Sequence, residues 1–374
     1  MTGRARPSIL ALALGLALAS VAPAAQAAPR PLTVGFYLPW DQASRAALVA
    51  HAARLDVLAP MSGALDSARG TLRWQDDPAR GPALAAAHGR ARVLPVVSNA
   101  HDNVWDTAAA DGALLDPAAG DAFIAALAAA AGAQGYGGYI LDFESLSPRA
   151  APAYAPFLAR LRAALKPAGK ELWVTAPLAA PAAVLQPLAQ ATDTVVLMAY
   201  DECWATGAPG PIAGQDWLEA NLDVRLGPAP ALDPTPHLDP THVVVALGAY
   251  AYDWPPAGAA AVLSAGEAAA LARRTGRPVL RAAPDFNPHL SYTAPDGQAH
   301  QVWWLDAAVW RAQAAAVQAR RARGVALWRL GLEDPALWTA GPAPAAAAHP
   351  ALPPPCAARP PAVATGASVS PSKP

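Results

Sequence analysis

Eight short apolar runs recur between residues 33 and 331, and each is rich in β-branched residues and almost continuously apolar. Strands buried on both faces of a parallel sheet have this pattern. The predicted strands are Thr33–Trp40, Asp56–Met61, Arg92–Asn99, Gly138–Glu144, Glu171–Leu178, Asp193–Glu202, His242–Tyr250 and Gly324–Gly331. Alanine-rich stretches such as Asp121–Ala131 and Tyr154–Lys166 separate the runs and predict helices, the second of which stops at Pro167. Alternating strands and helices are typical of the α/β class.

Eight such units predict a (β/α)8 TIM barrel, and a doubly wound sheet is the alternative. The polar and aromatic residues favour the barrel, because nearly every run carries them at its carboxyl end. These residues are Trp40, Asn99, Asp142, Glu144, Tyr200, Asp201, Tyr250 and Trp328. A closed barrel gathers such strand ends around one mouth, which is where barrel active sites lie.

A long stretch, about residues 255–305, separates the seventh and eighth predicted strands. It contains two β-like runs on either side of Pro295-Asp296-Gly297, a sequence typical of a hairpin turn. We therefore expect a small α+β insertion between strands 7 and 8, over the mouth of the barrel.

The N-terminal residues 1–27 have the pattern of a secretory signal peptide. Arg4 and Arg6 precede a short apolar run, and Ala25-Gln26-Ala27 fits an A-x-A cleavage site. The apolar run is too short to span a bilayer comfortably, and no later stretch is long and apolar enough to do so. We therefore expect a secreted or periplasmic protein without a membrane span.

The barrel is expected over residues 28–341, followed by a Pro/Ala-rich, disordered tail over 342–374. Only two cysteines occur, Cys203 and Cys356, so a disulfide framework is excluded. One bridge could form in an oxidising compartment, but Cys356 falls in the predicted tail, and this placement favours unpaired cysteines.

Composition and charge exclude several classes of function. The chain is 54% hydrophobic and 15% charged, which does not fit a disordered protein, and its net charge of −1 gives no basic excess for nucleic acid. The eight histidines form no H-x-x-x-H pair and no C-x-x-C motif accompanies them. We expect no metal site, no cofactor and no nucleic-acid partner.

The most informative segment is Gly137–Glu144, GGYILDFE. Residues two apart in a strand share a face, so Ile140, Asp142 and Glu144 should point into the barrel. Two acids at the end of a buried strand are costly unless they are hydrogen-bonded or used in chemistry. Their proximity favours protonation of one of them, which suits a general acid. The alternative is a strand end with two solvated acids.

This segment resembles a shortened D-x-x-D-x-D-x-E motif of glycoside hydrolase family 18, the chitinase-like (β/α)8 barrels. Met198–Asp201 is similar to the M-x-Y-D motif of the family's sixth strand, and Trp328 resembles the tryptophan of its last strand. Val34–Trp40 is similar to its first strand. The resemblance is greatest to a branch with spore-cortex-lytic hydrolases and modules fused to polysaccharide deacetylases. Gly137 and Ile140 stand where the family has its first two Asp residues.

The resemblance implies a substrate-assisted retaining mechanism, in which the 2-acetamido oxygen of the sugar attacks C1. It implies that Glu144 is the general acid, that Asp142 orients the acetamido group and that Tyr200 hydrogen-bonds its oxygen. Asp201 would contact the sugar and Trp328 would stack beneath it. Further substrate contacts are predicted for Tyr37, Trp40, Asn99 and Trp204.

We therefore expect an exported, monomeric glycoside hydrolase that acts on a polysaccharide with β-linked N-acetylglucosamine. Peptidoglycan, chitin oligomers and poly-N-acetylglucosamine are the candidate substrates. The alternative is a catalytically degenerate carbohydrate-binding barrel of a cell-wall or exopolysaccharide system, which the two missing Asp positions favour.

Overall fold

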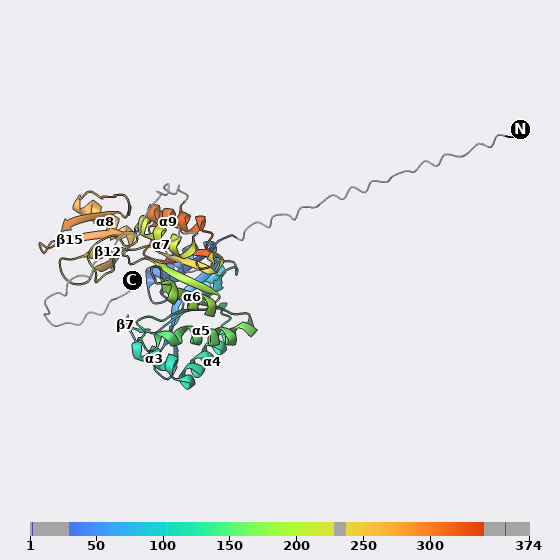
Figure 1. Cartoon of the computed structure of the whole chain (residues 1–374). Helices are drawn as coiled ribbons and strands as arrows, with labels where there is room; N and C mark the ends of the chain where they lie inside the picture. The colour runs from blue at the N-terminus through green and yellow to red at the C-terminus, as the bar shows by residue number, and fades with distance from the viewer. Residues whose placement is uncertain (1, 3–29, 103, 228–236, 340–355, 357–374) are drawn as a thin grey trace. The chain divides into compact units, whose positions relative to one another are not determined.

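The computed structural model describes residues 2, 30–102, 104–227, 237–339 and 356 of the 374-residue chain (Figure 1). The predicted signal peptide, apart from residue 2, lies outside the described residues. The predicted tail also lies outside them, apart from Cys356.

The predicted (β/α)8 barrel is confirmed, because eight parallel strands close on themselves. The strand order runs β1-β16-β11-β10-β9-β8-β5-β2, and β2 pairs back with β1, so the sheet has no open edge of the kind that a doubly wound sheet has. The strands are β1 (Leu32–Tyr37), β2 (Val57–Leu65), β5 (Val96–Ser98), β8 (Gly138–Asp142), β9 (Glu171–Pro177), β10 (Thr194–Ala199), β11 (Val243–Gly248) and β16 (Gly324–Trp328).

The third predicted strand is divided into β4 (Arg92–Val93) and β5. Pro95 lies at the break and has no N–H to give to a neighbouring strand, although its carbonyl accepts the Ile140 N–H at 3.0 Å. The division leaves the predicted order of strands unchanged.

Side chains alternate between the barrel interior and the helices, as β8 illustrates. The Tyr139 hydroxyl donates to the Leu127 carbonyl of helix α4 (Pro117–Ala133) at 2.7 Å, so Tyr139 points outward. Ile140 and Asp142 have the opposite parity to Tyr139 and Leu141, and so they face the interior. Both are buried.

Helices follow the strands and cover their outer faces through apolar side chains. The two predicted helices are present within α4 and α5 (Figure 1). The larger helices of the barrel are α1 (Gln42–His51), α2 (Arg80–Ala86), α3 (Thr107–Leu115), α4 (Pro117–Ala133), α5 (Ala151–Leu165), α6 (Ala182–Ala191), α7 (Gln215–Leu226) and α9 (Ala307–Ala319). Within the described ranges no single helix is long and apolar enough to cross a membrane; α3 and α4 reach that length only together, across a 99° bend.

The predicted α+β insertion is confirmed between β11 and β16. It is a four-stranded antiparallel sheet with the order β13-β12-β15-β14 and one helix, α8 (orange in Figure 1). Its elements are β12 (Ala251–Trp254), β13 (Ala261–Leu263), α8 (Ala265–Thr275), β14 (His289–Thr293) and β15 (Ala299–Trp304). The insertion begins a few residues before the predicted start, and β14 and β15 form the predicted hairpin around Gly297, whose φ of +86° suits glycine.

Two small hairpins extend the carboxyl ends of neighbouring barrel strands. β2 turns back into β3 (Leu72–Trp74), and β5 is followed by the pair β6 (Ala100–His101) and β7 (Val104–Trp105). Both hairpins contribute side chains to the mouth of the barrel.

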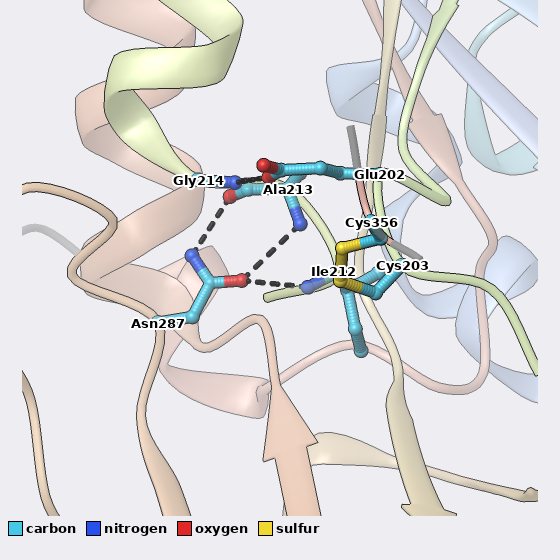
Figure 2. Close-up of a disulfide and its surroundings, with 7 residues drawn as sticks. All are labelled: Glu202, Cys203, Ile212, Ala213, Gly214, Asn287 and Cys356. Carbon is cyan, nitrogen blue, oxygen red and sulfur yellow. Dashed lines mark hydrogen bonds between the residues drawn. A yellow bond between two sulfur atoms is a disulfide. The ribbon is translucent and has the colours of Figure 1, made fainter. Parts of the chain in front are cut away.

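The expectation of unpaired cysteines is wrong, because Cys203 and Cys356 form a disulfide across 153 residues of sequence (Figure 2). Cys203 lies in the loop after β10 and is almost completely buried. Gly210 leaves room for the bridge, since a Cβ atom there would come within 2.5 Å of the Cys203 sulfur. The composition around Cys356 predicted a free tail, but it carries no information about which buried surface the cysteine reaches.

Candidate active site

A cavity of about 360 Å³ opens at the carboxyl ends of the barrel strands. Asp142 of β8 and Trp328 of β16 line it. Other lining residues come from the β2–β3 and β6–β7 hairpins and from the segment after β1; those with large or polar side chains are Trp40, Arg73, Gln75, Asp102 and Trp105. Asp142 of the predicted carboxylate motif therefore faces a cavity that is also lined by aromatic and polar side chains.

Asp142 is almost completely buried and faces the barrel interior. Its Oδ1 accepts a hydrogen bond from the Thr175 hydroxyl of β9 at 2.6 Å. Ile140 lies two residues earlier on the same face, and its partner in the register of β8 and β9 is Trp173. Both of these side chains are fully buried, so the interior beneath Asp142 is apolar.

Glu144 lies two residues beyond Asp142, where β8 has ended. The ring of Phe143, between the two acids, stacks on Tyr154 of α5 at 5.7 Å and so faces the helices. The Glu144 N–H donates to Asn99 Oδ1 at 2.9 Å, and the Glu144 carbonyl accepts from Asn99 Nδ2 at 3.0 Å. The backbone of Glu144 is thereby fastened to the end of β5.

Tyr200 follows β10, and its ring is stacked on Trp328 with 5.9 Å between centroids and 14° between planes. Burial raises the pKa of Tyr200 well above its ordinary value, and the negative charges of Asp142, Asp201 and Glu144 raise this pKa further. The phenol therefore stays protonated as a hydrogen-bond donor. The structure brings Asp142, Glu144, Tyr200 and Trp328 together.

Asp201 has a backbone φ of +58° and lies in a network of tyrosines. Its Oδ1 accepts hydrogen bonds from the hydroxyls of Tyr250 at 2.5 Å and Tyr252 at 2.9 Å. Burial, followed by the charge of Asp201, raises the pKa of both phenols. Asp201 is predicted to contact the sugar, but it is not among the residues that line the cavity.

The other predicted substrate contacts divide into one that reaches the cavity and three that do not. Trp40 lines the cavity and is 53% exposed, so its ring is accessible. Tyr37 is fully buried, and its hydroxyl donates to Asp77. Its neighbour Phe36 contacts Trp328 at 5.5 Å, so strand alternation turns Tyr37 away from the site.

Asn99 and Trp204 also lie away from the cavity surface. Asn99 has no exposed surface, and its side chain binds backbone groups of Glu144 and Asp106. Trp204 lies in the loop beside the disulfide, where Gly207 packs against its ring. The complete burial of Asn99 does not fit the predicted contact with substrate, whereas Trp204 is partly exposed and its contact stays a prediction.

Several residues of the site were not predicted from the sequence. Thr175 shares the inward face of β9 with Trp173, and strand alternation in ELWVTAP could have found it. Arg73, Gln75 and Trp105 lie on or beside strands of only two or three residues, which leave little hydrophobic pattern to detect. No group of three or more His, Cys, Asp or Glu side chains among the described residues is arranged to hold a metal ion.

Comparison with known proteins gives relatives in sequence and in fold. A cortical fragment-lytic enzyme of Bacillus cereus is 26% identical over 286 residues, which cover 72% of this chain and 63% of that protein. The crystal structure of a chitinase from Chromobacterium violaceum superposes with a TM-score of 0.71 and 28% identity, over 83% of this chain and 97% of that one. The spore cortex-lytic enzyme SleL of Bacillus cereus has the same fold, with a TM-score of 0.71 and 24% identity over 82% of this chain and 72% of that one. No family model matches the chain.

In its closed barrel the chain is similar to the chitinase from Chromobacterium violaceum, and two acids, a tyrosine and a tryptophan lie at the mouth of this barrel. The chain is also similar to the spore-cortex-lytic branch, as its sequence relatives indicate. The chain spans about half to two thirds of the length of the curated relatives that it matches.

Proposed function

We propose that the protein is an exported glycoside hydrolase that cleaves β-linked N-acetylglucosamine polymers by a substrate-assisted retaining mechanism. The observation that carries the proposal is that Tyr200 stacks on Trp328 and lies close enough to Asp142 and Glu144 for their charges to act on it, beside a cavity that Asp142 and Trp328 line. These groups supply one proton donor, one orienting carboxylate, one phenol and one aromatic face. Glycosidases of this kind depart from the usual scheme of two enzyme carboxylates because the substrate supplies the nucleophile.

In the first step the acetamido carbonyl oxygen of the sugar forms a bond to C1 as the glycosidic C1–O bond breaks. Glu144 gives its proton to the departing oxygen. Asp142 accepts a hydrogen bond from the acetamido N–H and balances the positive charge of the oxazolinium ion, while the Tyr200 hydroxyl donates a hydrogen bond to the acetamido oxygen. Water then attacks C1 as the bond from C1 to the acetamido oxygen breaks, which restores the acetamido group. Glu144 takes a proton from this water, and the two displacements at C1 together retain the β configuration.

The disulfide supports the exported location that the N-terminal sequence predicts. Stable disulfides form in oxidising compartments and are rare in the cytosol. The bridge between Cys203 and Cys356 uses both cysteines of the chain.

The alternative function is a carbohydrate-binding barrel that has lost turnover. The apolar pair Ile140 and Trp173 beneath Asp142 favours it, because no second carboxylate lies there to share a proton with Asp142. Such a protein would bind the same sugars without cleaving them.

The test is hydrolysis by the chain from residue 28 to residue 374, with the disulfide intact. Chitooligosaccharides, peptidoglycan and poly-N-acetylglucosamine are offered separately and the products are read by mass. Glu144→Gln removes the transferable proton and should lower turnover about a thousandfold while substrate binding remains. Glu267→Gln, in the first turn of α8, is the matched control and should match the wild type. Binding without cleavage by the wild type would support the alternative.

A further inference from the structure

Asn99 and Glu144 lie just beyond the ends of two neighbouring strands, Asn99 one residue past β5 and Glu144 two residues past β8. β5 and β8 pair in parallel, and Ser98 opposite Asp142 is the last pair in their register. Beyond that pair the strands stop, yet Glu144 stays fixed to the β5 side because the Asn99 side chain continues the pairing. The amide imitates a strand residue: its oxygen accepts the Glu144 N–H and its nitrogen donates to the Glu144 carbonyl.

The bonding capacity of Asn99 matches this position closely. Nδ2 makes a second donation, to the Asp106 carbonyl at 3.1 Å, and the Asp106 N–H donates back to the Asn99 carbonyl at 2.7 Å. Only one orientation of the amide satisfies one N–H and two carbonyl oxygens. Aspartate lacks the two donors and leucine lacks every polar atom, so asparagine is the residue that fits.

Other contacts hold the chain on both sides of Glu144. Before it, the Phe143 ring packs between Tyr154 and Phe123. After it, Ser145 has a φ of +53°, and its carbonyl accepts from the Thr107 hydroxyl at 2.8 Å. Asn99 is the residue whose side chain binds both backbone groups of Glu144 itself, and it is completely buried.

We propose that Asn99 is a positioning residue for proton transfer: it sets the backbone of Glu144 so that the carboxyl group meets the glycosidic oxygen. This inference rests on the proposed function of Glu144. General acid catalysis requires the acid within hydrogen-bond distance of the leaving oxygen, and a displacement of about 1 Å can cost about a hundredfold in rate. Loss of the clamp should therefore reduce proton donation more than sugar binding.

The test compares two β-N-acetylchitobiosides, one with a sugar leaving group and one with 2,4-dinitrophenolate. The dinitrophenolate departs without a proton, so its release does not depend on the general acid. The comparison uses kcat/KM, which reports departure of the leaving group, because the later step in which Glu144 acts as base is common to both substrates. Asn99→Ala should lower kcat/KM about a hundredfold on the sugar substrate and less than about tenfold on the dinitrophenyl substrate. KM for the sugar substrate should change by less than about threefold, because the clamp touches no substrate.

Two further variants keep the test decisive if Asn99→Ala folds poorly. Asn99→Asp keeps the shape of the side chain. The new carboxyl group faces two carbonyl oxygens and can donate a hydrogen bond to them only while it is protonated. Activity of this variant on the sugar substrate should therefore recover toward low pH relative to the wild type. Thr107→Val removes the hydrogen bond to the carbonyl of Ser145, the residue after Glu144. It should leave the ratio of kcat/KM on the two substrates unchanged.

Equal losses of kcat/KM on the two substrates, or no loss on either, would overturn the positioning role while the glycosidase assignment stands. If the wild type cleaves neither substrate, the proposed function fails and the role of Asn99 fails with it. A selective loss on the sugar substrate in Asn99→Ala and Asn99→Asp, absent in Thr107→Val, establishes the role.

Discussion

The two halves of the barrel mouth are built for different tasks. The half formed by β16, β1, β2, β5 and β8 contains the cavity and is extended by two short hairpins with polar and aromatic side chains. The half formed by β10, β11 and the insertion is filled by packed tyrosines. Tyr200, Tyr250 and Tyr252 touch one another in sequence, and two of them bind Asp201.

In the filled half, a disulfide and hydrogen bonds hold the loop after β10 in place. The loop after β10 is tied to Cys356 by the disulfide, and Asn287 of the insertion binds both N–H groups of Ile212 and Ala213 and the Ala213 carbonyl (Figure 2). Glu202 accepts the Gly214 N–H at 2.7 Å in the same loop. The open half presents accessible side chains along the cavity, whereas the filled half fixes the loop that carries Tyr200.

The candidate catalytic groups lie where the open half meets the filled half. Trp328 belongs to the open half because it lines the cavity, and it stacks on Tyr200 of the filled half. The candidate catalytic groups therefore stand at the boundary, where a rigid support meets an accessible cleft. Substitutions at the boundary should change turnover, those in the filled half should change stability, and those in the open half should change substrate affinity.

The largest effect is expected at the boundary. Tyr200→Phe removes one donor to the acetamido oxygen and should lower kcat about a hundredfold or more, with little change in KM. Tyr250→Phe in the filled half is the matched control, because Asp201 keeps its bond from Tyr252 and kcat should fall far less. Steady-state kinetics on chitooligosaccharides distinguishes the two variants. Equal losses of kcat would contradict the distinction between the boundary and the filled half.

In the filled half, loss of the disulfide should affect stability. Cys356→Ser opens a closed loop of 153 residues and should lower the free energy of unfolding by about 2–5 kcal/mol. The initial rate at 25 °C should remain near that of the wild type. Thermal unfolding followed by circular dichroism measures the effect, and the reducing agent that lowers the wild-type Tm should leave the variant unchanged.

Glu202 gives the filled half a dependence on pH. Burial raises the pKa of Glu202 from 4.5 to about 8. A carboxyl whose pKa is raised by folding stabilises the fold below its unfolded pKa, and that stability is lost as the pH rises through the folded value. The wild type should lose on the order of 2 kcal/mol between pH 5 and 8 relative to Glu202→Gln, as urea unfolding at both pH values would measure. If the free energies of unfolding of the wild type and Glu202→Gln differ by the same amount at both pH values, the raised pKa of Glu202 is contradicted.

The smallest effect is expected in the open half. Trp40 is 53% exposed, so Trp40→Ala should leave Tm unchanged. Loss of a stacking face costs about 1 kcal/mol, so KM for long oligosaccharides should rise about fivefold while kcat holds. Val104→Ala, at another exposed apolar position of the same half, is the control. A fall in kcat in Trp40→Ala would show that the open half contributes to turnover as well as to substrate affinity.

The sequence predicted the barrel well because its pattern is local. Each strand carries its own apolar run, and the polar end of each run marks the mouth, so Asp142, Tyr200 and Trp328 could be placed from neighbouring residues. The hairpins lack such a pattern. β7 has two residues, and the sequence around Trp105 therefore gives no period to detect.

Contacts between distant segments were the part that the sequence could not predict. Asn99 binds Glu144 across 45 residues, and Cys203 meets Cys356 across 153. Tyr37 shows a different difficulty: Phe36 and Tyr37 are both aromatic, so strand alternation alone leaves open which of them faces the barrel interior. The closed barrel decides this by placing Phe36 against Trp328.

The proposed function requires that the groups at the boundary cleave a glycosidic bond with help from the acetamido group of the substrate. Proton NMR of the first sugar released from chitotetraose by the wild-type chain, recorded before the anomers equilibrate, tests this requirement. A substrate-assisted retaining mechanism predicts β-anomer at the newly formed reducing end. Release of α-anomer first, or no release of sugar from any N-acetylglucosamine polymer, would contradict it.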